Sequence, residues 1–166
     1  MVNNAVVKCN DADIQIYQGY QTDGIVQNSM VNNAVVKCND GPIEIHQGYS
    51  GSIVQNSILN NAITNSSNVS INQAHNNGQI SDSYLTNKVY DSESNYISQY
   101  NIFNSLICNS TLFSDNTTIN QTNLSGVNGC LIAIGCHSYT KTIDNLVDTN
   151  FFNLVIGNHE VINWHW

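Results

Sequence analysis

The eleven residues MVNNAVVKCND occupy positions 1–11 and recur letter for letter at positions 30–40. The match continues beyond them, because IQIYQGYQTDGIVQNS (14–29) and IEIHQGYSGSIVQNS (43–57) differ by a few exchanges and one deletion. The repeating unit is therefore 28–29 residues long. Periods of this length are typical of solenoids, propellers and other repeat arrays, in which each unit packs on its neighbours. We therefore expect the chain to stack copies of one short unit.

Weaker copies of the unit follow at 53–64, 79–90, 102–111 and 127–136. Aligning them on a shared apolar position gives a column spaced by 29, 28, 26, 21 and 25 residues: Val2, Val31, Leu59, Leu85, Leu106 and Leu131. A second column, two residues later, contains Asn4, Asn33, Asn61 and Asn87, followed by Cys108 and Ala133. The first four rows agree closely. The last two leave a shift of one residue open.

The two-residue spacing between these columns indicates β-strands, because residues i and i+2 lie on the same face of a strand. The many Val, Ile and Thr residues favour strands as well. In the first unit we expect strands near 4–9, 13–17 and 24–29. The predicted fold is all-β, a parallel β-solenoid (β-helix) of about six coils of 21–29 residues. A β-sandwich or barrel containing a duplicated hairpin is the alternative.

The 29 Asn residues are many for a chain of 166 residues. Stacked coils place equivalent residues about 4.8 Å apart, so a column of Asn can exchange amide hydrogen bonds from coil to coil. Such a ladder would satisfy amides on the apolar face, where unpaired polar groups are costly. Cys9 and Cys38 hold equivalent positions in the two copies, and we expect them to be small apolar members of the stack rather than disulfide partners.

The repeat template fades towards the carboxyl end of the chain. We expect residues 1–136 to form the repeat solenoid. Residues 137–166, which contain Phe151, Phe152, Trp164 and Trp166, are expected to form a last coil or cap and an oligomerisation patch, because a terminal coil otherwise exposes an apolar face. Met1 aligns with Met30, inside the repeat. Either the natural protein extends further, or this open edge pairs with another molecule.

The charge of the chain argues against two classes of partner. The formal net charge is −8, with four Lys and no Arg. Nucleic-acid binding needs clustered cationic side chains, and docking on anionic membranes needs them too. No apolar run reaches the length of a membrane span, and no secretory signal is visible. We expect neither nucleic-acid nor membrane partners.

No catalytic or metal motif stands out in the sequence. Most acidic residues fall in predicted turns, where Asp is expected for local hydrogen bonding. Cys130, Cys136 and His137 do not have the spacing of a known metal site. We therefore expect no cofactor, no metal and no catalytic residues. A pair of carboxylates acting as in a glycosidase is the alternative.

One group of aromatic side chains is a candidate for ligand binding. It lies in the two QGY segments, together with Gln18 and Gln47, and contains Tyr17, Tyr20, His46 and Tyr49. Stacked on adjacent coils, these rings would form a ridge. A sugar ring could make apolar contacts with such a ridge and hydrogen bonds at its edges. The alternative is that the aromatic residues stiffen the turn or pack in an oligomer.

The Asn-, Ser- and Ile-rich units, with segments such as NGCLIAIGCHSYT and NFFNLVIGNHEV, resemble the β-solenoid shafts of bacteriophage tail fibres and tailspikes. The resemblance implies a structural protein of a virion or extracellular fibre at the cell surface, a trimer, and the binding of host surface glycans. YQGY and NNAVV are also similar in composition to curli-type functional amyloid. That second resemblance implies a self-assembling, end-to-end filament. A polysaccharide-degrading β-helix enzyme is a third alternative.

Overall fold

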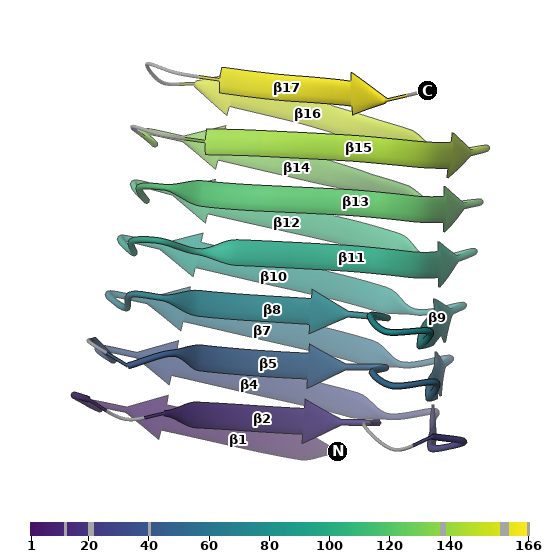
Figure 1. Cartoon of the computed structure of the whole chain (residues 1–166), viewed down its shortest axis with the longest axis horizontal. Helices are drawn as coiled ribbons and strands as arrows, with labels where there is room; N and C mark the ends of the chain where they lie inside the picture. The colour runs from purple at the N-terminus through teal and green to yellow at the C-terminus, as the bar shows by residue number, and fades with distance from the viewer. Residues whose placement is uncertain (12, 20–21, 40, 137–138, 157–159, 166) are drawn as a thin grey trace.

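The chain folds into a parallel β-solenoid of about six turns, which confirms the predicted fold class. The structure, a computed structural model, describes residues 1–166 except 12, 20–21, 40, 137–138, 157–159 and 166. Two sheets face each other, and each coil adds one strand to each sheet (Figure 1). The described residues contain no helix, and hence none that is long and apolar enough to cross a membrane.

We call the two sheets the back sheet and the front sheet, after their positions in Figure 1. The back sheet contains β1 (Val2–Val7), β4 (Met30–Val36), β7 (Ile58–Thr64), β10 (Tyr84–Tyr90), β12 (Leu106–Leu112), β14 (Asn128–Ile134) and β16 (Asn150–Ile156). The front sheet contains β2 (Ile14–Gln18), β5 (Ile43–Gln47), β8 (Val69–Gln73), β11 (Tyr96–Phe103), β13 (Thr117–Ser125), β15 (Tyr139–Val147) and β17 (Glu160–His165). Short strands β3 (Ile25–Gln27), β6 (Ile53–Gln55) and β9 (Gln79–Ser81) extend the front sheet in the first three coils.

Coil length changes along the solenoid while the strands stay in register. The spacing between stacked Asn residues is 29 residues from Asn4 to Asn33, and 22 residues from Asn87 to Asn109. Loops between the front-sheet strands and β3, β6 or β9 contribute to the longer coils. In the fourth coil, β11 runs through without such a loop and pairs with both β8 and β9. The insertions therefore bulge outward and leave the stacked core unchanged.

The predicted register is confirmed for four rows and wrong for the last two. Val2, Val31, Leu59 and Leu85 stack in order. The next residue in this column is Ile107, and the predicted Leu106 instead pairs with Tyr84 on the outer face, where it is 37% exposed. A shift of one residue moves a side chain to the other face of a strand. Because Leu106 and Ile107 are adjacent and both apolar, the sequence pattern does not show which of them points inward.

Leu131 is misplaced by two residues rather than one. It points inward and is 1% exposed, but its partner in the preceding coil is Asn109. It therefore continues the Asn column. The residue that continues the apolar column in this coil is Gly129, which pairs with Ile107. The last coils all have the 22-residue length, so the predicted spacings of 21 and 25 residues were both wrong.

A ladder of Asn side chains runs inside the back sheet, as predicted, and we call it the Asn rail. The Nδ2 atom of each Asn donates to the Oδ1 atom of the Asn in the next coil, over distances of 2.8–2.9 Å. Its members are Asn4, Asn33, Asn61, Asn87 and Asn109. Asn109 extends the rail by one residue beyond the prediction, where the sequence alignment had placed Cys108.

A second amide ladder faces the first from the front sheet, and we call it the Gln rail. Its members are Gln18, Gln47, Gln73, Gln99 and Gln121. Hydrogen bonds also cross the interior: Asn61 Nδ2 donates to Gln47 Oε1 over 3.0 Å, and Asn87 Nδ2 donates to Gln73 Oε1 over 3.0 Å. The two rails thus form one internal network that satisfies buried amides within and between coils. Gln121 Oε1, at the last coil of the Gln rail, is buried without a hydrogen-bond partner among the described residues.

The two rails have opposite hydrogen-bond polarity. In the Asn rail each amide donates towards the C-terminal coils, as from Asn33 to Asn61. In the Gln rail each amide donates towards the N-terminal coils, as from Gln73 to Gln47. Their dipoles therefore oppose each other. Both rails end in the fifth coil, because the next inward residues are Leu131 and Ile143.

The rails divide the apolar interior into two clusters. Both contain fully buried β-branched and Leu side chains from the two sheets. The first cluster includes Val35, Ile43, Ile45, Ile63, Ile71, Ile97 and Ile119. The second includes Val31, Val54, Leu59, Ile80, Leu85, Ile102 and Ile107. Apolar residues at equivalent positions of successive coils stack and fill the core. The alternating apolar positions of the sequence are therefore the buried positions of the structure.

The corners of the solenoid explain many of the remaining Asn and Asp residues. At the corner where the chain passes from the front sheet to the back sheet, one residue of each coil adopts a positive φ. The members of this column are Asn28, Asn56, Asp82, Asn104, Gly126 and Asp148. Asn, Asp and Gly tolerate this conformation better than other residues. Ser hydroxyls close the same corner: the backbone N–H of Ser57 donates to Ser83 Oγ, and that of Ser83 to Ser105 Oγ, both over 3.1 Å.

The opposite corner carries a similar column of Cys and Ser. Cys38 is 1% exposed, and its backbone N–H donates to Ser66 Oγ over 3.2 Å. Cys9 packs against the same apolar cluster as Cys38. The two thiols are free, and burial together with the contact between them raises the pKa of Cys9. They are therefore stacked neighbours, as predicted from their equivalent positions.

The segment predicted as a last coil or cap contains further solenoid strands. Within 137–166, β15, β16 and β17 continue both sheets in parallel register. Lys141 is 1% exposed and its Nζ donates to Asn153 Oδ1 over 3.0 Å, above the ring of Phe151. A buried cation thus replaces an apolar side chain in this coil. Residues 137–138 and 157–159 and Trp166 lie outside the described residues, as do the side chains of β17.

Candidate functional site

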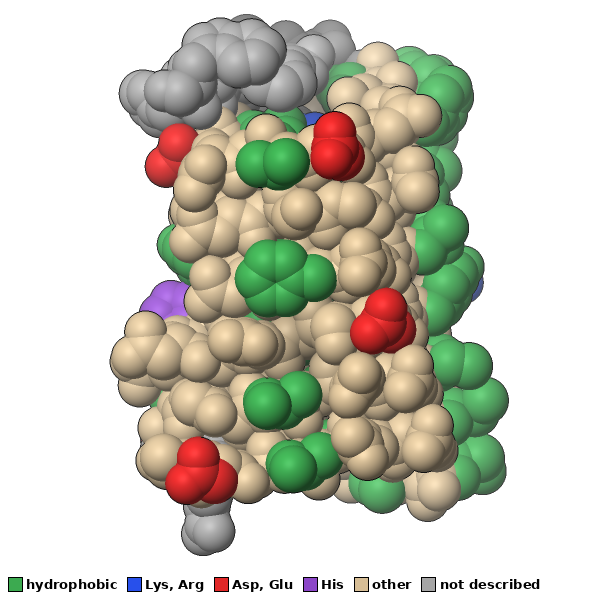
Figure 2. Space-filling view, turned by 90° about the vertical axis from the view of Figure 1, so that its right-hand side faces the viewer, with side chains coloured by type: hydrophobic (Ala, Val, Ile, Leu, Met, Phe, Trp, Pro, Cys, Tyr) green, Lys and Arg blue, Asp and Glu red, His purple; other side chains and the backbone are tan. Residues whose placement is uncertain are grey.

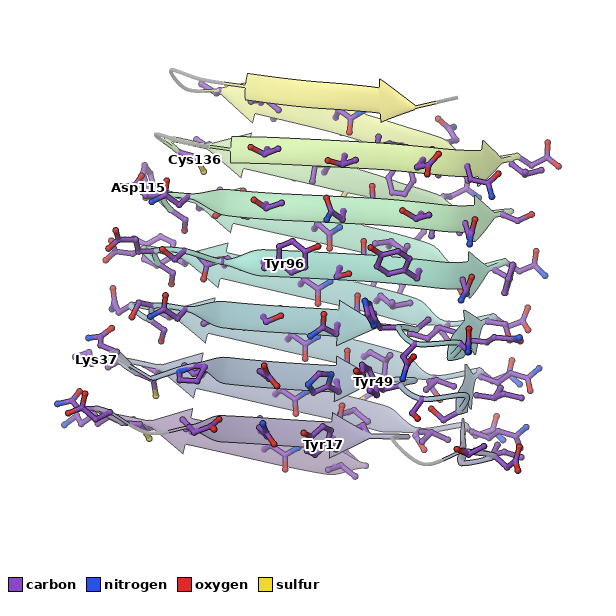
Figure 3. All side chains as sticks on the ribbon, in the orientation of Figure 1. Tyr17, Lys37, Tyr49, Tyr96, Asp115 and Cys136 are labelled. Atoms are coloured by element: carbon purple, nitrogen blue, oxygen red, sulfur yellow. The ribbon has the colours of Figure 1, made fainter. Side chains whose placement is uncertain are left out.

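The predicted aromatic ridge is a packed stack of rings on the front side of the first four coils (Figure 3). Tyr17 stacks on His46 with ring centroids 4.9 Å apart, and His46 meets Tyr49 edge-on at 4.7 Å. Tyr49 then stacks on His75 at 5.7 Å, and His75 meets Tyr100 edge-on at 5.0 Å. Tyr20, the fourth predicted member, lies outside the described residues.

Sequence reasoning missed His75 and Tyr100. His75 follows Gln73 by two residues, at the position equivalent to Tyr49, whereas Tyr100 follows Gln99 directly. The available signal was a ring within two residues of the Gln in each coil. His75 is partly buried, and this burial, with a smaller effect of the neighbouring His46, lowers its pKa. We also predicted that Gln18 and Gln47 accompany the ridge on the surface. They are instead interior members of the Gln rail.

The ring contacts limit how the ridge could hold a ligand. His46 is 7% exposed, and its Nε2 lies 3.1 Å from Glu44 Oε2. Tyr17 is 42% exposed, so it offers the largest accessible ring among the three described ridge residues that we predicted. Ring faces that pack on one another stabilise the stack of coils, as aromatic pairs do in protein cores. A ligand role for the ridge stays a prediction.

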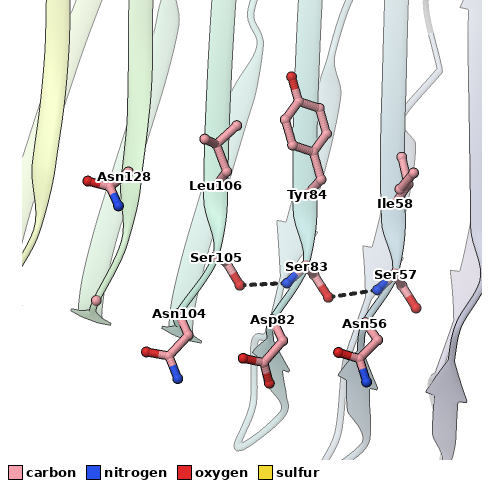
Figure 4. Close-up of a pocket in the computed structure, with 11 residues that line it drawn as sticks. Asn56, Ser57, Ile58, Asp82, Ser83, Tyr84, Asn104, Ser105, Leu106 and Asn128 are labelled. Atoms are coloured by element: carbon pink, nitrogen blue, oxygen red, sulfur yellow. Dashed lines mark hydrogen bonds between the residues drawn. The ribbon is translucent and has the colours of Figure 1, made fainter.

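A groove on another part of the surface combines apolar and polar side chains. It runs across the coils beside the positive-φ corner, has a volume of about 720 Å³, and is lined by residues of the third to sixth coils (Figure 4). Its lining residues are Asn56, Ser57, Ile58, Asp82, Ser83, Tyr84, Asn104, Ser105, Leu106, Gly126 and Asn128. This groove was not predicted from the sequence.

The two walls of this groove, which we call the corner groove, differ in chemistry. One wall contains exposed apolar side chains, with Ile58 at 37%, Tyr84 at 43% and Leu106 at 37% exposure. The other wall consists of exposed amide and carboxylate side chains from the positive-φ column, including Asp82 and Asn104. The Ser hydroxyls between the walls already hydrogen-bond within the corner (Figure 4). The corner groove thus offers one aromatic ring flanked by hydrogen-bonding groups.

The surface around the corner groove carries few charges. Figure 2 views the side of the molecule where the positive-φ corner lies, and most of it is uncharged, with scattered Asp and Glu side chains and apolar side chains gathered towards the back sheet. This face therefore does not present the clustered charges that would bind a charged partner strongly. Neutral ligands that combine apolar faces with hydroxyl groups fit it better.

Carboxylates meet at the opposite corner. Glu93 pairs in a parallel bridge with Asp115 of the next coil, and a groove there is lined by these two residues, Asp91 and several Asn and Ser residues. Within the described part of the chain, no three His, Cys, Asp or Glu side chains are arranged to hold a metal ion. These acids occupy turns, as predicted, and the structure by itself assigns them no chemistry.

Two cysteines are stacked on the outer face of the back sheet. Cys108 pairs with Cys130 in the next coil, and both thiols are free and partly exposed. Burial and the contact with Cys108 raise the pKa of Cys130 to about 11. The Cys130 thiol is therefore protonated at neutral pH and is a poor nucleophile. Cys136, by contrast, is buried in the first apolar cluster.

The comparisons leave the fold and these surfaces as the only basis for assigning a function. No protein-family model, no curated protein and no solved structure matches this chain.

Proposed function

We propose that this chain is a structural protein, a stiff β-solenoid shaft of an extracellular or virion fibre. The observation that carries the proposal is the pair of internal amide rails. Asn87, for example, is 0% exposed and forms hydrogen bonds with Asn61, Asn109 and Gln73. A network of this kind locks each coil to the next and to the opposite sheet.

The outer surface supports a structural role as well. The loops differ in length from coil to coil, whereas the stacked core stays the same. The fold therefore maintains a regular stack of strands along the solenoid axis and is not built around one cleft. Asn and Ser side chains at the corners satisfy the backbone locally, as between Ser83 and Ser105. A chain built this way resists extension, because separating two coils breaks backbone, rail and corner hydrogen bonds together.

Single-molecule pulling along the solenoid axis tests the proposal directly. Asn3 and Phe152 occupy the same outward column in the first and last coils, so Cys handles at these positions load the stack axially. The three partly exposed thiols, Cys9, Cys108 and Cys130, are replaced by Ser to avoid competing attachment. We expect a high rupture force that falls when Asn87→Leu interrupts the rail. Equal rupture forces for the two proteins would refute a load-bearing role for the rails.

A polysaccharide panel tests the competing enzymatic role. A structural shaft leaves polysaccharides intact. Depolymerisation that is lost in Glu93→Gln would identify the carboxylates of the opposite corner as catalytic and would replace the structural proposal.

The corner groove supports a second candidate function, the binding of surface glycans along the shaft. Sugar rings place an apolar face on an aromatic ring and satisfy their hydroxyl groups with amides and carboxylates. Tyr84, Asp82 and Asn104 present these groups together in the corner groove. The binding of a neutral glycan also fits the low charge of this face. This function is compatible with the shaft and does not depend on its mechanical role.

Matched tyrosine substitutions test glycan binding. On an array of neutral oligosaccharides, Tyr84→Ala should weaken binding about tenfold or more, because a stacking interaction contributes about 1–3 kcal/mol when an aromatic side chain is removed. Tyr90→Ala is the control, since Tyr90 is 46% exposed and lies outside the corner groove. If Tyr17→Ala abolishes binding and Tyr84→Ala does not, the aromatic ridge is the site instead.

A further inference from the structure

In this 166-residue chain, one side of the first coil, formed by β1 and β2, is an apolar surface that no other described strand covers. Among the described residues, β1 pairs only with β4 and β2 only with β5. Val2 is 48% exposed, whereas Val31, its equivalent one coil further, is 2% exposed. A hollow of about 710 Å³ at this end is lined mainly by the inward residues of the first coil. Unpaired strand edges of this kind are templates for another chain.

The amide rails give this end a defined hydrogen-bond polarity. Asn4 donates its Nδ2–H to Asn33, so its Oδ1 acceptor faces the open end. Gln18 accepts from Gln47 through Oε1, and its Nε2 donates one hydrogen to Asn33 Oδ1 across the interior, so the second Nε2 hydrogen faces the open end. The end therefore presents an acceptor on the back sheet and a donor on the front sheet, as a direct result of the opposite polarity of the rails.

We propose that two copies of this chain join end to end through β1 and β2, related by a two-fold axis parallel to the strands. β1 and β2 run in opposite directions (Figure 1). The rotation therefore lays β1 of one copy on β2 of the other in an antiparallel pairing. Asn4 then meets Gln18 of the second copy, acceptor to donor, and the same bond forms twice.

The apolar clusters are complementary under the same rotation. Gln18 hydrogen-bonds to Asn33 across the interior, which places the two rails at the same position along the strands. With Asn4 opposite Gln18 of the second copy, Val6 falls opposite Ile16, and these two residues pack against the same apolar cluster. The alternative two-fold axis, perpendicular to the sheets, would set Asn4 on Asn4 and Gln18 on Gln18. Like hydrogen-bonding groups would then face each other.

The proposed joint limits the assembly to two copies. A contact in which the same patch meets itself is isologous and forms no open chain. A head-to-tail filament would require matching amides at the other end, but both rails stop in the fifth coil at Leu131 and Ile143. The proposed joint therefore distinguishes a discrete dimer from the end-to-end filament expected from the resemblance to functional amyloid. It goes beyond the shaft function and does not rest on it.

Sedimentation equilibrium of the purified chain and of two neighbouring variants tests the joint. We expect a dimer for the unmodified chain. Val6→Lys should give a monomer, because it places a charge inside the joint. Val7→Lys is the matched control, since Val7 is 55% exposed on the outer face of the same strand; it should remain a dimer. Circular dichroism verifies that the variants keep their β structure. A monomeric or trimeric unmodified chain, or open-ended filaments, would overturn the proposal.

Disulfide trapping tests the orientation independently of that substitution. Ala5 and Tyr17 lie on the outer faces of opposite sheets and face each other only across the proposed joint. In a background with Cys9, Cys108 and Cys130 changed to Ser, oxidation should cross-link the double variant Ala5→Cys/Tyr17→Cys into a dimer. Each single variant should stay uncross-linked on a non-reducing gel. Cross-linking of Ala5→Cys alone, or none in the double variant, would rule out this two-fold axis.

Discussion

Asn87→Ala is expected to be among the most destabilising single substitutions in this chain. Asn87 is the fourth of the five members of the Asn rail and is 0% exposed. Its Oδ1 accepts from Asn61 Nδ2 over 2.8 Å and from Gln73 Nε2 over 3.4 Å, and its Nδ2 donates to Asn109 Oδ1 over 2.8 Å and to Gln73 Oε1 over 3.0 Å. Alanine removes all of these interactions.

The magnitude follows from the number of bonds and from their burial. A typical intramolecular hydrogen bond contributes about 1 kcal/mol net, and a buried group left without its partner costs about 1–3 kcal/mol. Asn61 and Asn109 each lose a rail partner in a place that water does not reach. We therefore expect Asn87→Ala to lower the free energy of unfolding by about 4 kcal/mol.

Urea unfolding followed by circular dichroism measures this loss. The control is Asn60→Ala, because Asn60 lies in the preceding coil of the same sheet but faces outward, where it donates to Asn32 over 2.9 Å and water can replace the lost bond. We expect that control to cost less than about 1 kcal/mol. Asn87→Leu fills the volume without restoring the bonds and should keep most of the loss. If Asn87→Ala costs no more than Asn60→Ala, or if Asn87→Leu is as stable as the unmodified chain, the hydrogen bonds of the rail do not stabilise the fold.

Four further outcomes are expected. Gly129→Ala should lower the free energy of unfolding by about 3 kcal/mol or more, because its Cβ would lie 2.0 Å from the carbonyl oxygen of Ile107; a thermal melt no lower than that of the unmodified chain would contradict this. Asn104, with a φ of 45°, should tolerate Gly in urea unfolding but lose about 1 kcal/mol on change to Ala; equal midpoints for the two variants would show that the positive φ is not the reason for Asn. His75 has a lowered pKa in the folded state, so the unfolded chain binds its proton first. His75 should therefore reduce stability as the pH falls below about 6.5, and its effect should be absent above that pH; the urea midpoint of His75→Gln should fall less than that of the unmodified chain between pH 7.5 and 5, and parallel decreases would refute the assignment. Cys130, whose pKa is raised to about 11 from 9.0, should react with iodoacetamide at pH 8 about a hundredfold more slowly than an unperturbed thiol; mass spectrometry of the alkylated peptides that showed a normal rate would contradict this.

Much of the fold could be predicted from local patterns. The duplicated units showed the period, and the alternation of Val, Asn and Val in residues 31–35 showed which side chains face inward. The period needs only a comparison of one unit with its copy. The alternation is contained within a few residues of one strand, since successive side chains of a β-strand point to opposite faces. The ladder of Asn4, Asn33, Asn61 and Asn87 followed from these signals because identical residues at the repeat period must stack.

The register of the last coils could not be predicted in the same way. Leu106 and Ile107 are adjacent and both apolar, so either satisfies a pattern that asks for one inward apolar residue. Pairing decides between them: β12 hydrogen-bonds to β10 with Ile107 opposite Leu85. The constraint comes from the constant stacking of backbones, and it acts between residues far apart in the chain.

The Gln rail and the corner groove were decided by the tertiary structure alone. Gln47 is polar and lies next to aromatic residues in the sequence, which suggested a surface position. Its burial follows from the opposite sheet, where Asn61 supplies the hydrogen-bond partner that makes an interior amide tolerable. Tyr84 and Asn104 meet only because successive coils bring their corners together. The sequence by itself determined the repeat, the strand faces and the Asn ladder, since these follow from the pattern within single strands and from its recurrence at the repeat period. The partners across the interior and the surfaces assembled from several coils required the stack, because the residues concerned become neighbours only when the coils close on one another.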